Sequence, residues 1–218
     1  MLQDIKAAIF DMDGTLVDSM WIWEDIDSQY LSEHNIEIPP TLKASIGHLS
    51  YQEVAEYFKK TFNLPYTKEE ILAHWNSMAY DKYANEVPLK SGVKEFLKLL
   101  KSMNIKIALA TSNSKNLLEA CLKPNGIYDY FDVITTTSEV SRGKDFPDVY
   151  LLTAERLGVK PENCIVFEDI LAAVKGAKAA NMKVVGVYDK YAKADHNEMK
   201  KLADLFIDKY EELSQKIS

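Results

Sequence analysis

The sequence has few cysteines and no long apolar run, and each absence excludes a class of protein. Cys121 and Cys164 are its only cysteines, and they form no C-x-x-C pair, which is typical of a chain in a reducing compartment. No apolar run approaches the ~18 residues that a membrane helix requires. Residues 1–6 lack the basic and apolar regions of a signal peptide. We therefore expect a cytoplasmic protein with no membrane partner.

Basic residues are in the minority. Lys and Arg total 26 against 33 Asp and Glu, which leaves a net charge of −7. Proteins that bind nucleic acid gather positive charge, so we expect no nucleic-acid partner. This balance does not exclude a small anionic substrate whose site is locally positive. With 218 residues, 47% of them hydrophobic, the chain can bury a sizeable core, and a monomer is the default expectation.

Several well-known site motifs do not occur. The phosphate-binding patterns G-x-x-x-x-G-K-[ST] and G-x-G-x-x-G are missing, and so is the hydrolase elbow G-x-S-x-G. The histidines show no spacing typical of metal ligands, and they are His34, His48, His74 and His196. A phosphate or metal site would therefore have to be built from other residues.

The most informative stretch is the first apolar run. Residues 6–10 are typical of a short buried strand, and Asp11, Asp13 and a glycine follow it. Two carboxylates there are costly without a partner, and Mg²⁺ binds one or two carboxylates together with phosphate oxygens. An Asp-Gly turn without function stays an alternative. An EF-hand loop does not, because Leu16 and Ile22 occupy its glycine and glutamate positions.

Helical spacing of apolar residues dominates from about residue 20 to residue 83. We expect four helices there, which would form a bundle inserted after the first strand. The predicted helices run through Trp21–Leu31 with a stop at Asn35, through Leu42–Ile46, from a capping box at Ser50–Glu53 through Phe58, and from a capping box at Thr67–Glu70 to about Tyr83.

Strand and helix patterns alternate from Pro88 onward. Alternation of this kind predicts an α/β fold with a parallel sheet and right-handed crossovers. The predicted strands are 105–110, 130–135, 164–167, 183–187 and 205–207. The predicted helices are one capped by Ser91, one from about Lys115, and those at 146–157, 170–180 and 198–202.

Polar residues stand out at the ends of these strands, where parallel sheets bind ligands. Each alone has an ordinary explanation: a Thr-Ser pair often caps a helix, a lone lysine is usually solvated, and an acidic pair often faces a helix dipole. Four such features in order favour one site. They are Asp11 with Asp13, Thr111 with Ser112, Lys144, and Glu168 with Asp169.

These features resemble motifs I to IV of the haloacid dehalogenase-like (HAD) hydrolases. The run Ala7–Ser19 has the strand and D-x-D-G-T of motif I, and the other features follow at comparable spacing. The resemblance looks closest to the beta-phosphoglucomutase-like phosphatases. It implies a Rossmann-like core (1–17 and 88–218) with helices on both faces, a C1-type helical cap (18–87) that closes over the site, and a small phosphorylated metabolite as substrate.

The resemblance also implies a role for each catalytic residue. Asp11 would attack phosphorus and form an aspartyl-phosphate, and Asp13 would act as general acid and then general base. Thr111 would donate its hydroxyl to the phosphoryl oxygens, and Lys144 would offset their negative charge.

The expected binding residues overlap with these. Mg²⁺ would be held by the Asp11 carboxylate, the Asp13 backbone carbonyl and Asp169, with Glu168 nearby or through water. The metal residues implied are Asp11, Asp13, Glu168 and Asp169. The substrate-binding residues implied are Gly14, Thr111, Ser112, Asn113 and Lys144.

The sequence departs from the family pattern at several positions. Asp145 follows Lys144 where relatives usually have proline, and it places negative charge beside the lysine. Ile170 replaces a frequent serine, and Ala173 and Asn181 replace frequent glycines. The acids themselves are intact.

One departure bears on the activity. Trp23 and Ser50 occupy places where the sugar-phosphate mutases carry a histidine and an arginine that grip a second phosphate. We therefore expect a phosphatase, with a mutase as the alternative and a non-catalytic phosphometabolite-binding module as the second alternative. Candidate pocket residues of the cap are Trp21, Trp23, His48 and Tyr51, although a place in the cap core is the better explanation for each tryptophan.

Overall fold

The computed structural model describes residues 4–46 and 51–213. Contacts divide the chain into two compact units, Met1–Met20 with Val87–Ser218 and Trp21–Glu86. Interpretation of these units as a catalytic core and a cap domain, with boundaries at 17/18 and 87/88, stays a prediction. In the described ranges, no helix combines the length and the apolar character that crossing a bilayer demands.

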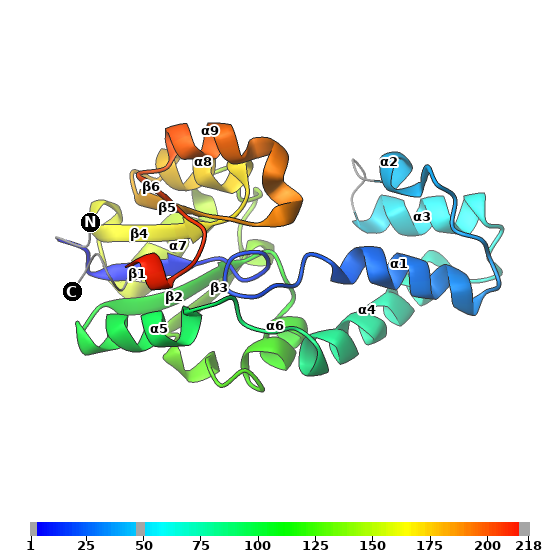
Figure 1. Ribbon diagram of the computed structural model, residues 1–218, viewed down its shortest axis with the longest axis horizontal. Helices are drawn as coiled ribbons and strands as arrows, with labels where there is room; N and C mark the ends of the chain where they lie inside the picture. The colour runs from blue at the N-terminus through cyan, green and yellow to red at the C-terminus, as the bar shows by residue number, and fades with distance from the viewer. Residues whose placement is uncertain (1–3, 47–50, 214–218) are drawn as a thin grey trace. The chain divides into compact units, whose positions relative to one another are not determined.

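The first unit is built on a parallel sheet. The described strands lie in the order β3-β2-β1-β4-β5-β6, and each neighbouring pair is parallel (Figure 1). This confirms the predicted α/β class. The strands are β1 (Ala7–Phe10), β2 (Lys106–Thr111), β3 (Val133–Thr136), β4 (Cys164–Glu168), β5 (Lys183–Val187) and β6 (Leu205–Ile207).

Helices cover both faces of this sheet, as Figure 1 shows. They are α5 (Val93–Ser102), α6 (Lys115–Leu122), α7 (Asp148–Leu157), α8 (Leu171–Ala179) and α9 (His196–Leu202). Short 3₁₀ turns lie between them, at Tyr128–Tyr130, Thr137–Glu139, Pro161–Asn163 and Lys190–Asp195.

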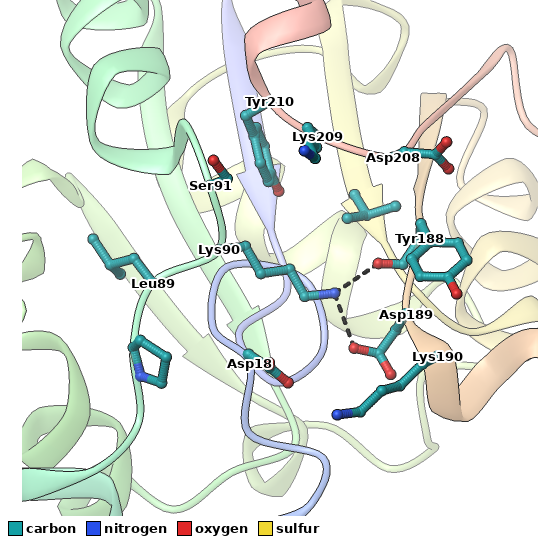
Figure 2. A pocket seen from close by; sticks show the side chains of 12 residues that line it. Asp18, Leu89, Lys90, Ser91, Tyr188, Asp189, Lys190, Asp208, Lys209 and Tyr210 are labelled. Atoms are coloured by element: carbon teal, nitrogen blue, oxygen red, sulfur yellow. Dashed lines mark hydrogen bonds and ion pairs between the residues drawn. The ribbon is translucent and has the colours of Figure 1, made fainter.

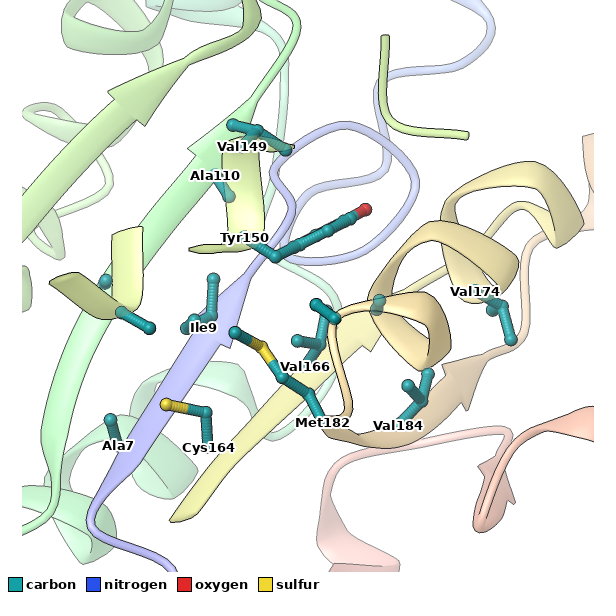
Figure 3. Packing of buried hydrophobic residues seen from close by; sticks show 14 of the residues in the cluster. Ala7, Ile9, Ala110, Val149, Tyr150, Cys164, Val166, Val174, Met182 and Val184 are labelled. Atoms are coloured by element: carbon teal, nitrogen blue, oxygen red, sulfur yellow. The ribbon is translucent and has the colours of Figure 1, made fainter. Parts of the chain in front are cut away.

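One face of the sheet packs on α7, α8 and α9. Ile9 of β1 and Val166 of β4 belong to a buried cluster on this face that also includes Tyr150 of α7 and Val174 of α8 (Figure 3). All four side chains are buried, and each aliphatic one contributes about 1.5–3 kcal/mol by leaving water. Because alternate residues of a strand share a face, Asp11 continues the Ile9 side toward α7.

Aromatic rings fill the opposite face. Phe10 and Phe167 stack with ring centroids 4.4 Å apart, and Phe96 of α5 meets Phe167 edge-on at 5.6 Å. Tyr210 closes the cluster at 5.5 Å from Phe96. These rings anchor the carboxyl ends of the two central strands, β1 and β4, directly beneath the residues that follow them.

The second unit is helical. Its helices are α1 (Ile22–Glu33), α2 (Leu42–Ile46), α3 (Tyr51–Thr61) and α4 (Lys68–Asn85). Thr67 and Glu70 form the predicted capping box, and Asn35 follows α1 with a φ of 57°. Trp75 is the centre of the packing, with Phe58 at 5.0 Å and Tyr30 at 5.7 Å. The capping role predicted for Ser50 lies outside the described residues.

Three local predictions differ from the structure. Ser91 does not cap α5; Gly92 is the N-cap with a φ of 78°, and the Ser91 hydroxyl donates to Glu211. α7 begins at Asp148 rather than residue 146, because Pro147 stands at its N-cap. β3 begins at Val133 rather than residue 130, because a 3₁₀ turn occupies the three residues before Phe131.

Candidate active site

Four charged side chains meet at the carboxyl ends of β1 and β4, and they belong to Asp11, Lys144, Glu168 and Asp169. Phe10 pairs with Phe167 across these strands, and the Asp11 amide still donates to the Phe167 carbonyl at 3.0 Å, so Asp11 lies beside Glu168. The Lys144 ammonium contacts the Asp11 carboxylate and donates to Glu168 Oε1 at 2.7 Å. These three residues come from distant parts of the sequence and are all buried.

Three of the acids form a group that could hold a metal ion. Ligand oxygens of Asp11, Glu168 and Asp169 lie within 4.8 Å of one another. Among the described residues, Glu168 Oε2 is buried without a hydrogen-bond partner. A cluster of carboxylate oxygens with one buried oxygen unsatisfied suits a hard divalent cation such as Mg²⁺. The residues therefore fit the ion that the family resemblance implies.

Burial controls the electrostatics of this group. It raises the pKa of Glu168 to about 7, with the charge of Asp11 adding to the rise and Lys144 opposing it. Burial and the Asp11 charge likewise raise the pKa of Asp169 well above its ordinary value. Burial lowers the pKa of Lys144, but the Asp11 and Glu168 carboxylates outweigh burial and raise it. One lysine thus faces three acids, and the remaining negative charge favours binding of a cation.

Two residues that sequence reasoning missed orient the acids. The Tyr150 hydroxyl donates to Glu168 Oε1 at 2.9 Å, and the Thr15 hydroxyl donates to Asp169 Oδ1 at 3.2 Å. Burial and the Glu168 charge raise the pKa of Tyr150, so its phenol stays protonated and donates. Nothing in the sequence marks Tyr150 except its place one turn into a helix that follows Lys144.

The Asp13 carboxylate is not a member of the three-acid group. Its carboxylate accepts from the Ser19 hydroxyl at 2.7 Å and from the Asn113 amide at 2.9 Å. The Asn113 contact links the end of β2 to the loop after β1. Asn113 was expected to bind substrate and Ser19 was not singled out, and here both fix the orientation of Asp13. The expected metal contact of Asp13 uses its backbone carbonyl rather than this carboxylate.

Thr111 and Ser112 differ in their surroundings. Thr111 is buried at the end of β2, where its hydroxyl oxygen accepts from the backbone N–H of Asn113 at 3.0 Å. Ser112 is exposed, as is Asp145 next to the buried Lys144. The roles expected for Thr111 and Ser112 on phosphoryl oxygens stay predictions.

Gly14 is required where the chain turns after Asp13. Its φ is 79°, and a Cβ at this position would lie 2.1 Å from Asp169 Oδ2. Its N–H donates to the Val17 carbonyl inside the loop. Absence of a side chain therefore lets the loop after β1 lie directly against the residue after β4.

A cavity of about 300 Å³ opens beside this loop (Figure 2). Asp18 lines it on one side and the end of β5 on the other. Lys90 also lines the cavity, and its ammonium donates to the Tyr188 carbonyl at 2.7 Å and to Asp189 at 2.9 Å. The Lys90 charge also opposes the rise in the pKa of Asp169. Lys90 thus fixes the chain after Val87 to the core.

The structure describes three of the four residues that were predicted to face the pocket of a cap, namely Trp21, Trp23 and Tyr51. The Trp23 and Tyr51 rings meet edge-on at 5.3 Å, and the Lys82 ammonium lies 5.6 Å from the Trp21 ring. Trp21 and Trp23 are half-buried, so their exposure does not distinguish a pocket-facing side chain from a core side chain. The positions predicted at His48 and Ser50 lie outside the described residues. A pocket-facing role for the other three stays a prediction.

Comparison with known proteins now defines the class. The sequence model of the haloacid dehalogenase-like hydrolases matches residues 8–187, which include Asp11, Asp13, Lys144, Glu168 and Asp169. The chain belongs to this family, as the D-x-D-G-T run indicated. The match covers the sheet from β1 to β5 and the buried group of acids at the ends of β1 and β4, whereas β6 lies beyond it.

Individual members of the family are similar to this chain over most of its length. Hexitol phosphatase B of Escherichia coli K12 is 29% identical over 98% of this chain and 96% of its own length. The phosphorylated carbohydrates phosphatase of Thermotoga maritima is 29% identical over 84% of this chain and 85% of its own. The crystal structure of beta-phosphoglucomutase from Clostridium difficile matches with a TM-score of 0.72 at 28% identity, over 96% of this chain and 93% of its own.

Proposed function

We propose that the protein is a Mg²⁺-dependent phosphatase that hydrolyses a small phosphorylated carbohydrate through an aspartyl-phosphate. The observation that carries this proposal is the buried contact of Lys144 with Asp11 and Glu168, beside Asp169. This arrangement supplies a nucleophile, a fixed positive charge and a metal-binding group of oxygens in one small volume.

Asp11 is the proposed nucleophile. Its carboxylate oxygen attacks phosphorus, a new P–O bond forms, and the bond to the sugar oxygen breaks. The Lys144 contact holds this carboxylate in one orientation and offsets the charge that builds up on the transferred group. Phosphoryl transfer depends mainly on such positioning and charge neutralisation.

Asp13 is the proposed proton carrier. In the first step it gives a proton to the leaving sugar oxygen, and in the second it takes one from the water that attacks the phosphoryl group on Asp11. Inorganic phosphate then leaves and Asp11 is regenerated. The contacts from Ser19 and Asn113 support this role, because they hold Asp13 outside the three-acid group where it can alternate between the two states.

Asp11 and Asp169, with Glu168, would hold Mg²⁺, together with the backbone carbonyl of Asp13. Bound there, the ion neutralises negative charge on the carboxylates and on the phosphoryl oxygens. The Thr111 hydroxyl, the Ser112 N–H, Gly14 and Asn113 complete the proposed phosphate-binding set. Support comes from their positions in the loop after β1, at the end of β2 and in the loop that follows β2.

The proposed substrate class rests on the relatives, which are named for hexitol phosphates and phosphorylated carbohydrates. A sugar phosphomutase is the second candidate, because beta-phosphoglucomutase shares the fold at 28% identity. Trp23 and Ser50, in place of the residues that grip a second phosphate, favour the phosphatase.

A substrate screen tests this proposal. The protein is incubated with Mg²⁺ and p-nitrophenyl phosphate, hexitol phosphates and sugar phosphates, and released phosphate is measured. Asp11→Asn should abolish turnover, whereas Asp129→Asn, a matched change at an exposed site away from the Lys144 loop, should not. Isomerised beta-glucose 1-phosphate without free phosphate would favour the mutase. Binding without turnover of any phosphate ester would favour the binding module.

A further inference from the structure

The loop that carries Lys144 is held in place without the proline that usually follows this lysine in relatives. Asp145 stands there instead, so the backbone lacks the fixed φ that proline supplies. The loop is short, and the Phe146 N–H donates to the Gly143 carbonyl at 3.0 Å, which makes a turn around Lys144. Lys144 must nonetheless place one ammonium against two buried carboxylates.

The solvent side of the loop is closed by Arg142. Its guanidinium donates from Nε to one Asp148 oxygen at 3.1 Å and from a terminal nitrogen to the other at 2.7 Å. The same guanidinium lies 4.3 Å from the centre of the Phe146 ring. A planar two-point pair of this kind fixes direction as well as distance. It joins the two ends of the loop, with Lys144 between them.

The inner side of the loop rests on α8 at Gly176. A Cβ at Gly176 would lie 2.0 Å from the Lys144 carbonyl oxygen and 2.8 Å from that of Phe146. Both oxygens belong to backbone, which cannot swing away as a side chain can. Glycine therefore lets the loop approach the helix at a distance that any other residue would prevent.

We propose that Arg142, Phe146 and Gly176 are positioning residues that set the place of the Lys144 ammonium. Arg142 and Phe146 press the loop from outside, and Gly176 sets how deep it lies. The inference rests on the proposed function in one respect, the role of Lys144 in offsetting phosphoryl charge. A loop displaced outward carries Lys144 away from Asp11, and a shift near 1 Å costs up to about 10²-fold in rate.

Two variants with matched controls test this inference. Arg142→Ala is compared with Arg156→Ala, which removes an exposed arginine and its 2.7 Å pair with Glu139 but leaves the loop untouched. Gly176→Ala is compared with Gly158→Ala, where a Cβ meets nothing within 4 Å. Each control repeats the chemical change at a site away from Lys144. Arg142→Lys keeps the charge but not the two-point geometry.

We expect Arg142→Ala and Gly176→Ala to lower kcat by about 10-fold or more, and to weaken inhibition by inorganic phosphate. Arg142→Lys should behave as Arg142→Ala does, because geometry and not charge is lost. Both controls should keep kcat and phosphate inhibition within about 2-fold of the parent, although Arg142→Ala and Arg156→Ala lower the melting temperature to a similar extent.

Equal kcat in Arg142→Ala and Arg156→Ala, or full rescue by Arg142→Lys, overturns the inference and leaves the proposed function standing. Absence of turnover in the parent protein overturns the proposed function instead. A crystal structure of Arg142→Ala then decides the inference without activity. Lys144 Nζ still 2.7 Å from Glu168 Oε1 overturns it, and a displaced ammonium supports it.

Discussion

Lys144 Nζ lies 2.7 Å from Glu168 Oε1, and both side chains are buried at the sheet edge. Removal of the ammonium leaves Glu168 and Asp11 as uncompensated buried charges. Lys144→Ala should therefore lower the free energy of unfolding by about 3–5 kcal/mol in Mg²⁺-free buffer, the usual cost of breaking a buried pair. It should also lower kcat by about 10²–10³-fold.

Urea unfolding and turnover of p-nitrophenyl phosphate measure the two effects of Lys144→Ala. Lys178→Ala is the matched control, because its pair with Asp204 at 2.9 Å is partly exposed to solvent. That control should cost no more than about 1 kcal/mol and leave kcat unchanged. Equal stability losses in the two variants would contradict the buried pairing.

Gly14 provides a steric prediction. Gly14→Ala places a Cβ 2.1 Å from Asp169 Oδ2 and keeps a φ of 79°, whereas Gly158→Ala has a φ of 66° but open space around the Cβ. Both pay about 1–2 kcal/mol for the left-handed backbone. Only Gly14→Ala should lose further stability and most of its activity. Thermal unfolding and kcat of the two variants separate the clash from the backbone cost.

Asp169 connects stability to metal binding. Its raised pKa means that the charged carboxylate is unfavourable where it lies, so Asp169→Asn should raise the melting temperature of the metal-free protein. Thr15 can still donate to the amide oxygen, which limits any loss of packing. The same variant should lose the rise in melting temperature that Mg²⁺ produces in the parent.

Asp208→Asn, an exposed change in the segment after β6, is the control for Asp169→Asn. It should leave the Mg²⁺-dependent rise intact. Melting curves recorded with EDTA and with saturating Mg²⁺ measure this rise in each variant. An unchanged Mg²⁺ response in Asp169→Asn would show that the ion binds elsewhere.

The sequence predicted that the residues of this candidate site lie close together, because local apolar patterns indicate where strands end. Apolar runs ended by Asp11, Thr111 and Glu168 predict that these residues share one edge, since parallel strands bring their carboxyl ends together. In the structure, the register of β1 with β2 and β4 brings the ends of these three strands to the same edge of the sheet. Lys144 was found by the family pattern rather than by periodicity, because a loop lysine has no local signature.

Other contacts were out of reach because they depend on packing between distant segments. Tyr150 reaches Glu168 only once α7 lies across the sheet, and Tyr210 donates to the Thr15 carbonyl across 195 residues of chain. The prediction that Ser91 caps α5 was wrong for the same reason. Its hydroxyl donates to Glu211, 120 residues away, and Gly92 occupies the N-cap position instead.

Asp27 of α1 offers a test in the other unit. Burial, with the charge of Glu24 adding to it, raises the pKa of Asp27 from 3.8 to about 7. Between these values the folded state keeps a proton that the unfolded state has lost, so this group's contribution to stability falls as pH rises through that window. The side chain of Asp27→Asn cannot ionise, so the variant does not lose this stability as the pH rises.

Fluorescence can follow this unit by itself. Every tryptophan of the chain lies within residues 21–86, and they are Trp21, Trp23 and Trp75. From about pH 5 to about pH 8, Asp27→Asn should gain about 1–3 kcal/mol over the parent in urea unfolding. Asp81→Asn, an exposed loss of one negative charge on α4, should gain little. A pH-independent difference between Asp27→Asn and the parent would mean that Asp27 is already ionised in the folded protein at pH 5.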